Sequence, residues 1–253
     1  MKNIKLTLLL LLVSTILFSQ DSVKHFVAYN SLSGNKVPGS DIKSNLSFGV
    51  RGAYKNPVTK AKLNSATKLD DICEGYPANW LNNYVSTEIV STSNGKKVKA
   101  SGLNGTLTSE QKKIVSSVDI GAEVLIDVKY KTQNSATDKT EIRTMSFSVT
   151  VVPDVEANFK GGKVQMKQYM KEKVIDNIPS NITSSLRQAM VKFTVNEEGE
   201  IINARVSEST GDQDIDRLML EGVNKMPKWI PAKNSSGEKV KQDFEFVMAN
   251  EGC

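Results

Sequence analysis

The sequence is poor in the side chains that carry most enzyme chemistry. Its 253 residues include one histidine, His25, and two cysteines, Cys73 and Cys253. A Ser-His-Asp or Cys-His arrangement would have to use His25, which lies in weakly patterned sequence. One histidine and two cysteines do not complete a four-ligand zinc site without carboxylates, and no spacing suggests one. We therefore expect no catalytic residue, no metal site and no cofactor.

Aromatic residues and phosphate-binding loops are also scarce. Aromatics make up 6% of the chain, so the core should rest mainly on Val, Ile, Leu and Met. Gly161-Gly162 lacks the further glycines and the Lys-Ser/Thr pair of a phosphate loop. The acidic run from Asp212 starts like a calcium loop, but Arg217 replaces the loop glycine and Val223 the final glutamate. Acidic capping of a helix is the better interpretation of this run.

Long apolar runs are absent after the first twenty residues. There, Lys2 and Lys5 precede an apolar run at 6–18, which falls short of the ~20 residues that span a bilayer. This pattern is typical of a secretory signal peptide over residues 1–20, with cleavage near Ser19 or Gln20. We expect a periplasmic or secreted protein. An uncleaved inner-membrane anchor is the alternative, and membrane contact is expected only in that case.

The charges do not indicate a nucleic-acid partner. The 33 basic and 28 acidic residues are interleaved along the chain. The densest basic patch, at 96–99, follows the turn signal Asn94-Gly95 and predicts a solvated hairpin. In an oxidising compartment Cys73 and Cys253 could pair as a disulfide, although chain ends usually fray.

Residues 21–153 predict an antiparallel β-rich domain. The first part, 21–75, is weakly patterned, with short strands expected at 23–29 and 46–50. Residues 84–90 and 96–100 flank Asn94-Gly95 as a hairpin, and Thr108 with Gln111 forms a capping box for a short helix. Two alternating runs, around 124–130 and 145–151, then predict strands with one buried face. We expect that face to pack on a second sheet.

Residues 154–253 predict a smaller α/β domain. A helical pattern at 164–176 ends at Ile178-Pro179, and strands follow at 190–195 and 201–206. Gly199 supplies the positive φ of the turn between them. A second helix begins at Gly211-Asp212, and the last strand covers 242–248. The fold class is therefore α+β, with two helices on a three-stranded antiparallel sheet in this second domain.

Four motifs in this domain, in their order and spacing, resemble the TonB carboxy-terminal domain family over residues 153–248. They are Phe159-Lys160-Gly161-Gly162, the strand 191–195 with Glu198-Gly199, Ser209-Thr210-Gly211-Asp212, and Met226-Pro227-Lys228-Trp229-Ile230-Pro231-Ala232 with Gly237. Pro227 should end the helix, and Trp229 should form an apolar plug beneath the following segment. The residues expected to maintain the fold are Gly161, Gly162, Gly199, Gly211, Asp212, Pro227, Trp229, Pro231 and Gly237.

The resemblance implies a non-enzymatic protein that binds an extended segment of an outer-membrane or envelope protein by strand addition. The candidate edge strand consists of Gln242, Asp243, Phe244, Glu245, Phe246, Val247 and Met248. Its alternation fits a half-buried edge, but an internal or blocked strand is an open alternative. The alternative function is an inner-membrane-anchored energy transducer, although the sequence has no Pro-rich spacer. Self-association as a homodimer is also left open.

Overall fold

The structure, a computed structural model, describes residues 46–250 apart from 80, 82, 94–95 and 136–137. These described residues all belong to one compact unit, Lys43–Cys253. The expected signal segment, His25, the expected strand at 23–29 and Cys253 lie outside the described residues. Within the described residues, every helix is too short or too polar to cross a bilayer.

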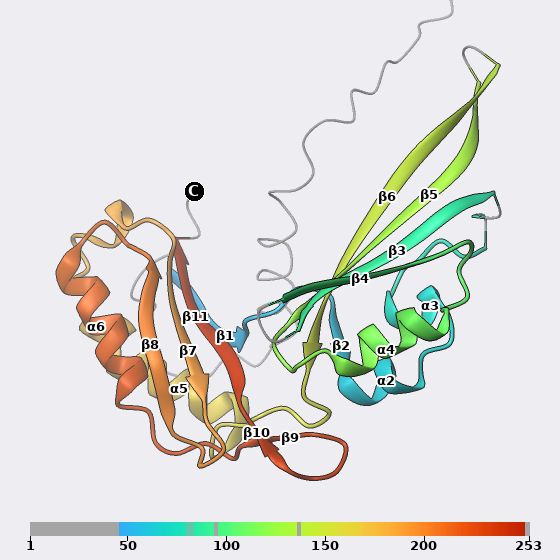
Figure 1. The fold of residues 1–253 in the computed structure, drawn as a ribbon. Helices are drawn as coiled ribbons and strands as arrows, with labels where there is room; N and C mark the ends of the chain where they lie inside the picture. The colour runs from blue at the N-terminus through green and yellow to red at the C-terminus, as the bar shows by residue number, and fades with distance from the viewer. Residues whose placement is uncertain (1–45, 80, 82, 94–95, 136–137, 251–253) are drawn as a thin grey trace, which may run out of the picture. The chain divides into compact units, whose positions relative to one another are not determined.

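The first sheet has five strands in the order β2-β6-β5-β3-β4 (Figure 1). Only the β2–β6 pair is parallel. The strands are β2 (Pro57–Thr59), β3 (Tyr84–Ser93), β4 (Lys96–Gly102), β5 (Glu123–Asn134) and β6 (Lys139–Val152). The helices are α2 (Lys60–Ser65), α3 (Leu69–Ile72) and α4 (Ser109–Ser117), and they lie on one face of the sheet. The predicted hairpin and the two alternating strands are confirmed.

Helices, not a second sheet, bury the inner face of these strands. Val124, Ile126 and Val128 are fully buried, and their core includes helical residues such as Leu63 and Val115. The expectation of a second sheet is therefore wrong. The α4 capping box is confirmed, because Thr108 Oγ1 accepts from Gln111 N–H and Gln111 Oε1 accepts from Thr108 N–H.

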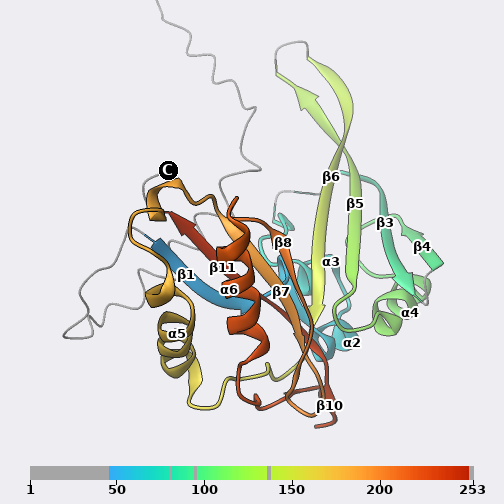
Figure 2. The same cartoon turned by 90° about the vertical axis from the view of Figure 1, so that its left-hand side faces the viewer.

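The second sheet has four strands in the order β1-β11-β7-β8, all antiparallel. Its strands are β1 (Leu46–Gly52), β7 (Ala189–Val195), β8 (Ile201–Glu208) and β11 (Gln242–Asn250). The helices α5 (Gly162–Lys173) and α6 (Gln213–Asn224) cover one face of it, as Figure 2 shows. Short elements complete the domain: the 3-10 turns η1 (Ile175–Asn177) and η2 (Thr183–Ser185), and the strand pair β9 (Ala232–Lys233) and β10 (Lys239–Val240).

The α+β class and the order of helices and strands in the second domain are confirmed. Gly161 and Gly162 adopt positive φ at the start of α5, and Asp212 caps α6 by accepting from the N–H groups of Asp214 and Ile215. One strand differs from the expectation. β1 lies in the sequence assigned to the first domain, yet it forms the fourth strand of the second sheet.

Candidate functional site

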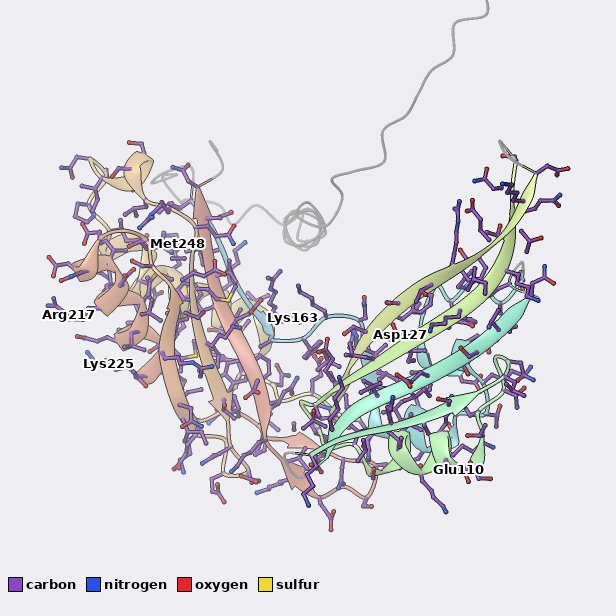
Figure 3. All side chains as sticks on the ribbon, turned by 45° about the horizontal axis from the view of Figure 1, so that its top comes forward. Glu110, Asp127, Lys163, Arg217, Lys225 and Met248 are labelled. Atoms are coloured by element: carbon purple, nitrogen blue, oxygen red, sulfur yellow. The ribbon has the colours of Figure 1, made fainter. Side chains whose placement is uncertain are left out.

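The last strand, β11, has one face in the core beneath the helices and one mixed face, which carries Asp243, Glu245 and the buried Val247. Phe244, Phe246 and Met248 point into the core that α5 and α6 cover, and each is at most 5% exposed. Figure 3 shows Met248 within the sheet, whereas Arg217 and Lys225 project from the outer side of α6. Because side chains alternate along a strand, Asp243 and Glu245 lie on the opposite face.

Of the two alternatives for β11, an open edge or an internal strand, the structure shows the internal strand. Each of Gln242, Asp243, Phe244, Glu245, Phe246, Val247 and Met248 has a partner on β7. From Phe244 onward, each β11 residue also has a partner on β1. The alternation of a strand reports which face is buried, but it carries no information about a pairing partner about two hundred residues away.

β1 fits along β11 through its backbone and through its side chains. All seven residues of β1 have a partner on β11, and Ala53 N–H extends the ladder by donating to Asp243 O at 3.0 Å. Leu46, Phe48 and Val50 turn towards the helices and pack against the core. A peptide that binds by strand addition uses the same two features, backbone pairing along its length and alternate side chains in apolar sites.

On the face of the sheet away from α5 and α6, an ion pair joins β1 to β11. Arg51 Nε donates to Glu245 Oε1 at 2.6 Å, and the two side chains are 32% and 11% exposed. Glu245 also lies opposite Lys192 on β7, and Lys192 lies opposite Arg205 on β8. A row of four charged residues thus crosses the sheet, and Glu245 is its single acid. No local sequence signal links Arg51 to Glu245, so Arg51 is not among the predicted site residues.

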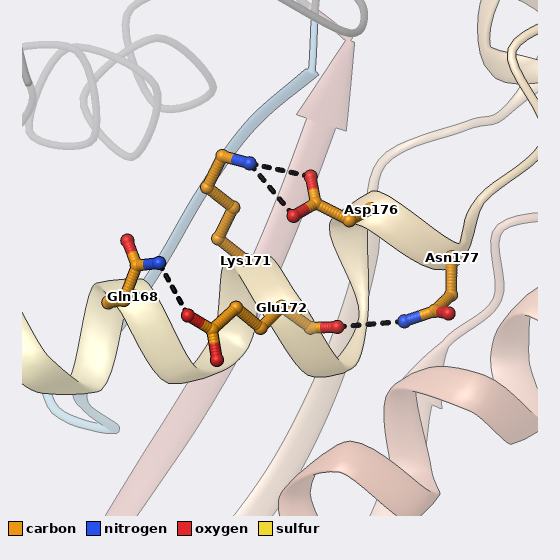
Figure 4. A network of polar contacts seen from close by, with 5 residues as sticks. All are labelled: Gln168, Lys171, Glu172, Asp176 and Asn177. Atoms are coloured by element: carbon orange, nitrogen blue, oxygen red, sulfur yellow. Dashed lines mark hydrogen bonds and ion pairs between the residues drawn. The ribbon is translucent and has the colours of Figure 1, made fainter. Parts of the chain in front are cut away.

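Helix α5 covers β1 from the apolar side. Lys167 Nζ lies 5.9 Å from the centre of the Phe48 ring, within range of a cation–π interaction. The carboxyl end of α5 is joined to η1 by a polar network of Gln168, Lys171, Glu172, Asp176 and Asn177 (Figure 4). In it, Lys171 Nζ donates to both carboxylate oxygens of Asp176, at 2.7 and 2.8 Å. These contacts hold the carboxyl end of α5, the helix that packs over β1, against η1.

The other border of the sheet, β8, is irregular. Its pairing with β7 shifts register at two places, and Asn203 has a φ of 55°. Bulges of this kind twist an edge strand and hinder the addition of another strand. Among the described residues, no strand pairs with the outer side of β8. The regular side of the sheet is the one that β1 takes.

Behind β11, Trp229 forms the apolar plug that the sequence predicts. It is 5% exposed, and its ring centre lies 4.9 Å from that of Phe244 and 5.6 Å from that of Phe159. The backbone N–H of Trp229 donates to Gly199 O at 2.8 Å. A Cβ on Gly199 would lie 2.1 Å from Trp229 O, so this turn requires glycine for space as well as for its φ of 80°. The plug thus holds β11 and the β7–β8 turn together.

At the start of α6, Asp216 ties the preceding loop to the helix. Its carboxylate accepts from Ser209 Oγ at 2.5 Å and from Thr210 N and Oγ1, both at 2.8 Å. Burial disfavours the charged form, but these hydrogen bonds outweigh it and lower the pKa of Asp216. Gly211 has a φ of 93°, and a Cβ added to it would lie 3.2 Å from the Arg187 guanidinium.

The remaining motif residues lie at the ends of elements. Pro227 follows α6, Pro231 directly precedes β9, and Gly237 has a φ of 80° in the turn between β9 and β10. None of these residues lines the strand that pairs with β1. Their places are those of residues that shape the domain around the site.

The described part of the chain holds neither a cluster of metal ligands nor a reactive thiol. There, no three His, Cys, Asp or Glu side chains converge as metal ligands. Cys73 is buried, and this burial raises the pKa of its thiol to about 12. The suggested bridge to Cys253 stays a prediction, because Cys253 is outside the described residues.

A comparison with known families identifies the second domain. Residues 165–248 match the family model described as TonB C terminal, from within α5 to within β11. The match excludes β1 and the whole first sheet. No curated protein and no solved structure was found to match the chain. The chain therefore contains a TonB-type domain, and such a domain implies interactions with other proteins of the cell envelope.

Proposed function

We propose that this protein is an exported, non-enzymatic interaction protein of the cell envelope. In this proposal its TonB-type domain holds an extended segment of another envelope protein as a strand along β11. The observation that carries the proposal is the β1–β11 pairing, in which a segment remote in sequence adds to the domain over seven residue pairs. This pairing supports the proposal that the β1 side of β11 accepts an added strand.

The geometry favours an extended polypeptide over other ligands. Backbone groups of β11 supply the hydrogen bonds, so only a chain in strand conformation can satisfy all of them. The core takes alternate side chains of the added strand, as it takes Phe48 and Val50 of β1. A non-enzymatic role is supported by the composition of the site, which consists of backbone groups, apolar side chains and one ion pair.

A disulfide lock tests the proposal in the full chain. Ser47 and Ala249 are direct partners on β1 and β11. Residues paired in this way lie about 4.5–5.5 Å apart, within the range of a disulfide. In a Cys253→Ser background, Ser47→Cys with Ala249→Cys would covalently hold β1 on β11 when oxidised. Reduction of the same sample provides the matched control.

Both forms would be incubated with an outer-membrane extract, cross-linked through lysines such as Lys192 and Lys241, and mapped by mass spectrometry. We expect the reduced form to cross-link to an extended segment of an envelope protein and the oxidised form to lose that product. Equal capture by the two forms would show that the partner does not add along β11.

A second candidate, the anchored energy transducer, is favoured by the apolar run at 6–18. It differs from the first in the fate of residues 1–20, and mass spectrometry of the protein purified from its native envelope separates the two. A mature amino terminus near Gln20 or Asp21 excludes the transducer. An intact first segment in the inner-membrane fraction excludes the exported form.

A further inference from the structure

β1 is seated less firmly than the strand on the other side of β11. Of the three β1 side chains that face the core, Val50 is buried, whereas Leu46 and Phe48 are only partly buried. Two of its seven residues, Gly49 and Gly52, are glycines, which weaken a strand because they pack no side chain. After the Ala53 hydrogen bond to Asp243, the chain reaches β2 of the first sheet within four residues. These features favour release of β1 from β11 while the remaining strands of both sheets stay paired.

We propose that β1 is a built-in stand-in for the partner segment and that Glu245 selects the partner's charge. The segment that replaces β1 carries apolar residues at three alternate positions and a basic residue directly after the third. In β1 these positions are Leu46, Phe48, Val50 and Arg51. This inference rests on the proposed function, because it describes the partner of the same strand.

The three apolar positions follow from the cover above β1. Leu46, Phe48 and Val50 pack against the core that α5 and β11 share, so a polar residue at any of these positions would lose its hydration there. The residues between them, Ser47 and Gly49, lie on the other face, outside this core. The apolar alternation fixes the register of the incoming strand, because a shift of one residue exchanges its two faces.

The basic position follows from Glu245. Its side chain is 11% exposed, and on the outer side Arg51 neutralises it at 2.6 Å. A segment with a neutral residue at this position would bury the carboxylate without that partner, at a cost in affinity. Lys192 lies on the inner side of Glu245 and stays there whichever strand is bound. Since Lys192 does not change, the difference in affinity between basic and neutral segments depends on the contact between Glu245 and the added strand.

β1 also sets a threshold for binding. Because it is tethered a few residues from its site, it competes at a high effective concentration, on the order of millimolar for a short flexible link. A segment that matches only part of the pattern cannot displace β1. A matching segment of an envelope protein, presented at a membrane surface, can.

Peptide binding to the full chain tests the selection. Arg51→Ala in the chain weakens the hold of β1 while leaving the apolar sites in place. Two labelled peptides are compared by fluorescence anisotropy: the sequence of β1, LSFGVRG, and the same peptide with glutamine for arginine. We expect the arginine peptide to bind about tenfold more tightly, the range of a partly buried charge pair. In the Arg51→Ala/Glu245→Gln chain the difference should shrink to less than about twofold.

The possible outcomes separate the two levels of the proposal. Equal binding of both peptides to the Arg51→Ala chain would overturn the selection by Glu245 and leave strand addition standing. If neither peptide binds, while the locked and reduced Ser47→Cys/Ala249→Cys forms capture the same proteins, strand addition itself fails. Light scattering of the wild-type chain measures whether a second copy of the chain is the partner. A dimer that the lock prevents from forming would identify β1 of a second copy as the partner and overturn the choice of another envelope protein.

Discussion

β11 has a neighbouring strand on each side, and the two neighbours differ in how they are held. β7 and β1 are both antiparallel to β11, and each pairs with it over seven residues. On β7, Val191, Phe193 and Val195 are at most 1% exposed. On β1, Val50 is 4% exposed, and the other two inward side chains are only partly buried. Equal backbone pairing thus accompanies unequal side-chain burial.

Unequal burial of side chains, more than backbone pairing, makes one neighbour of β11 more permanent than the other. A backbone hydrogen bond in a sheet replaces one with water, so its net contribution is small, about 0.5–1.5 kcal/mol. Burial of a large apolar side chain contributes about 1.5–3 kcal/mol. β7 buries more apolar side-chain surface than β1, and a short turn also joins it to β8. β1 depends more on its backbone pairing and on one ion pair, which a foreign segment can reproduce.

The sharpest test of this contrast is a truncation on each strand. Phe193 lies between Trp229 and Phe244, with ring centres at 6.0 and 5.7 Å. Phe193→Ala should cost about 3–5 kcal/mol, because it leaves a cavity in a rigid core. Phe48→Ala on β1 should cost roughly 1–2 kcal/mol, because the ring is only partly buried. Urea unfolding, followed by hydrogen exchange of β11 peptides, measures both. Equal costs would break the contrast.

The turn that joins β7 to β8 gives the next largest effect. Gly199→Ala places a Cβ 2.1 Å from Trp229 O. The resulting shift would weaken the hydrogen bond that the backbone N–H of Trp229 donates to Gly199 O. We expect a loss of about 2–4 kcal/mol, from strain and a weakened hydrogen bond. Gly237→Ala is the matched control, because Gly237 has the same φ of 80° and nothing within 4 Å of its Cβ position. It should cost only about 1 kcal/mol. Thermal unfolding compares the two variants, and equal shifts would show that the contact with Trp229 does not matter.

Local signals explain how much of the fold could be predicted from the sequence. The alternation of Val124, Ile126 and Val128, the capping box at Thr108 and the glycine at 199 each act within a few residues, and each is found in the structure. The fold class followed from their order along the chain. α2 and α3 were missed because helices of six and four residues are too short to show a period. Without them, a second sheet was the natural cover for the strands.

The candidate site was predicted in part, and its missing half is non-local. The alternation of Phe244 and Phe246 correctly marks β11 as a strand with a buried face. A short strand at 46–50 was also expected, but nothing in its sequence assigns it to a sheet whose other strands begin at Ala189. The Arg51–Glu245 pair spans 194 residues. A pairing of that range is decided by which exposed edge the packed domain offers, and neither segment records that alone.

The loop that leads into α6 gives a third, smaller test on the β7 side. Asp216→Asn should cost about 1.5 kcal/mol, because Ser209 and Thr210 lose a charged acceptor; partial exposure keeps the cost at the low end. Asp214→Asn is the control in the same helical turn. The side chain of Asp214 is 82% exposed and forms an ion pair with Arg217, so we expect a change below about 0.5 kcal/mol.

The pH dependence of Asp216 has a defined sign. Because its pKa is lowered in the folded protein, ionised Asp216 stabilises the fold above its ordinary value of 3.8. That contribution is lost as the pH falls through the folded pKa. Wild type and Asp216→Asn should therefore differ in unfolding free energy near pH 7, begin to converge as the pH falls below about 4, and meet once the pH lies below the lowered folded pKa. Curves that stay parallel down to pH 2 would show that the charge of Asp216 is not what stabilises the loop.

The smallest effect bears most directly on β1. Arg51→Ala should cost about 1 kcal/mol, between the values of exposed and buried ion pairs. Lys99→Ala, which removes an exposed pair with Glu88 at 3.2 Å in the first sheet, should cost less than about 0.5 kcal/mol. Because β1 depends on Arg51 and β7 does not, hydrogen exchange in Arg51→Ala should accelerate at the amides of β1 and leave those of β7 unchanged. Equal acceleration on both sides of β11 would mean that the two neighbours open together, and β1 could then not be exchanged without the rest of the sheet.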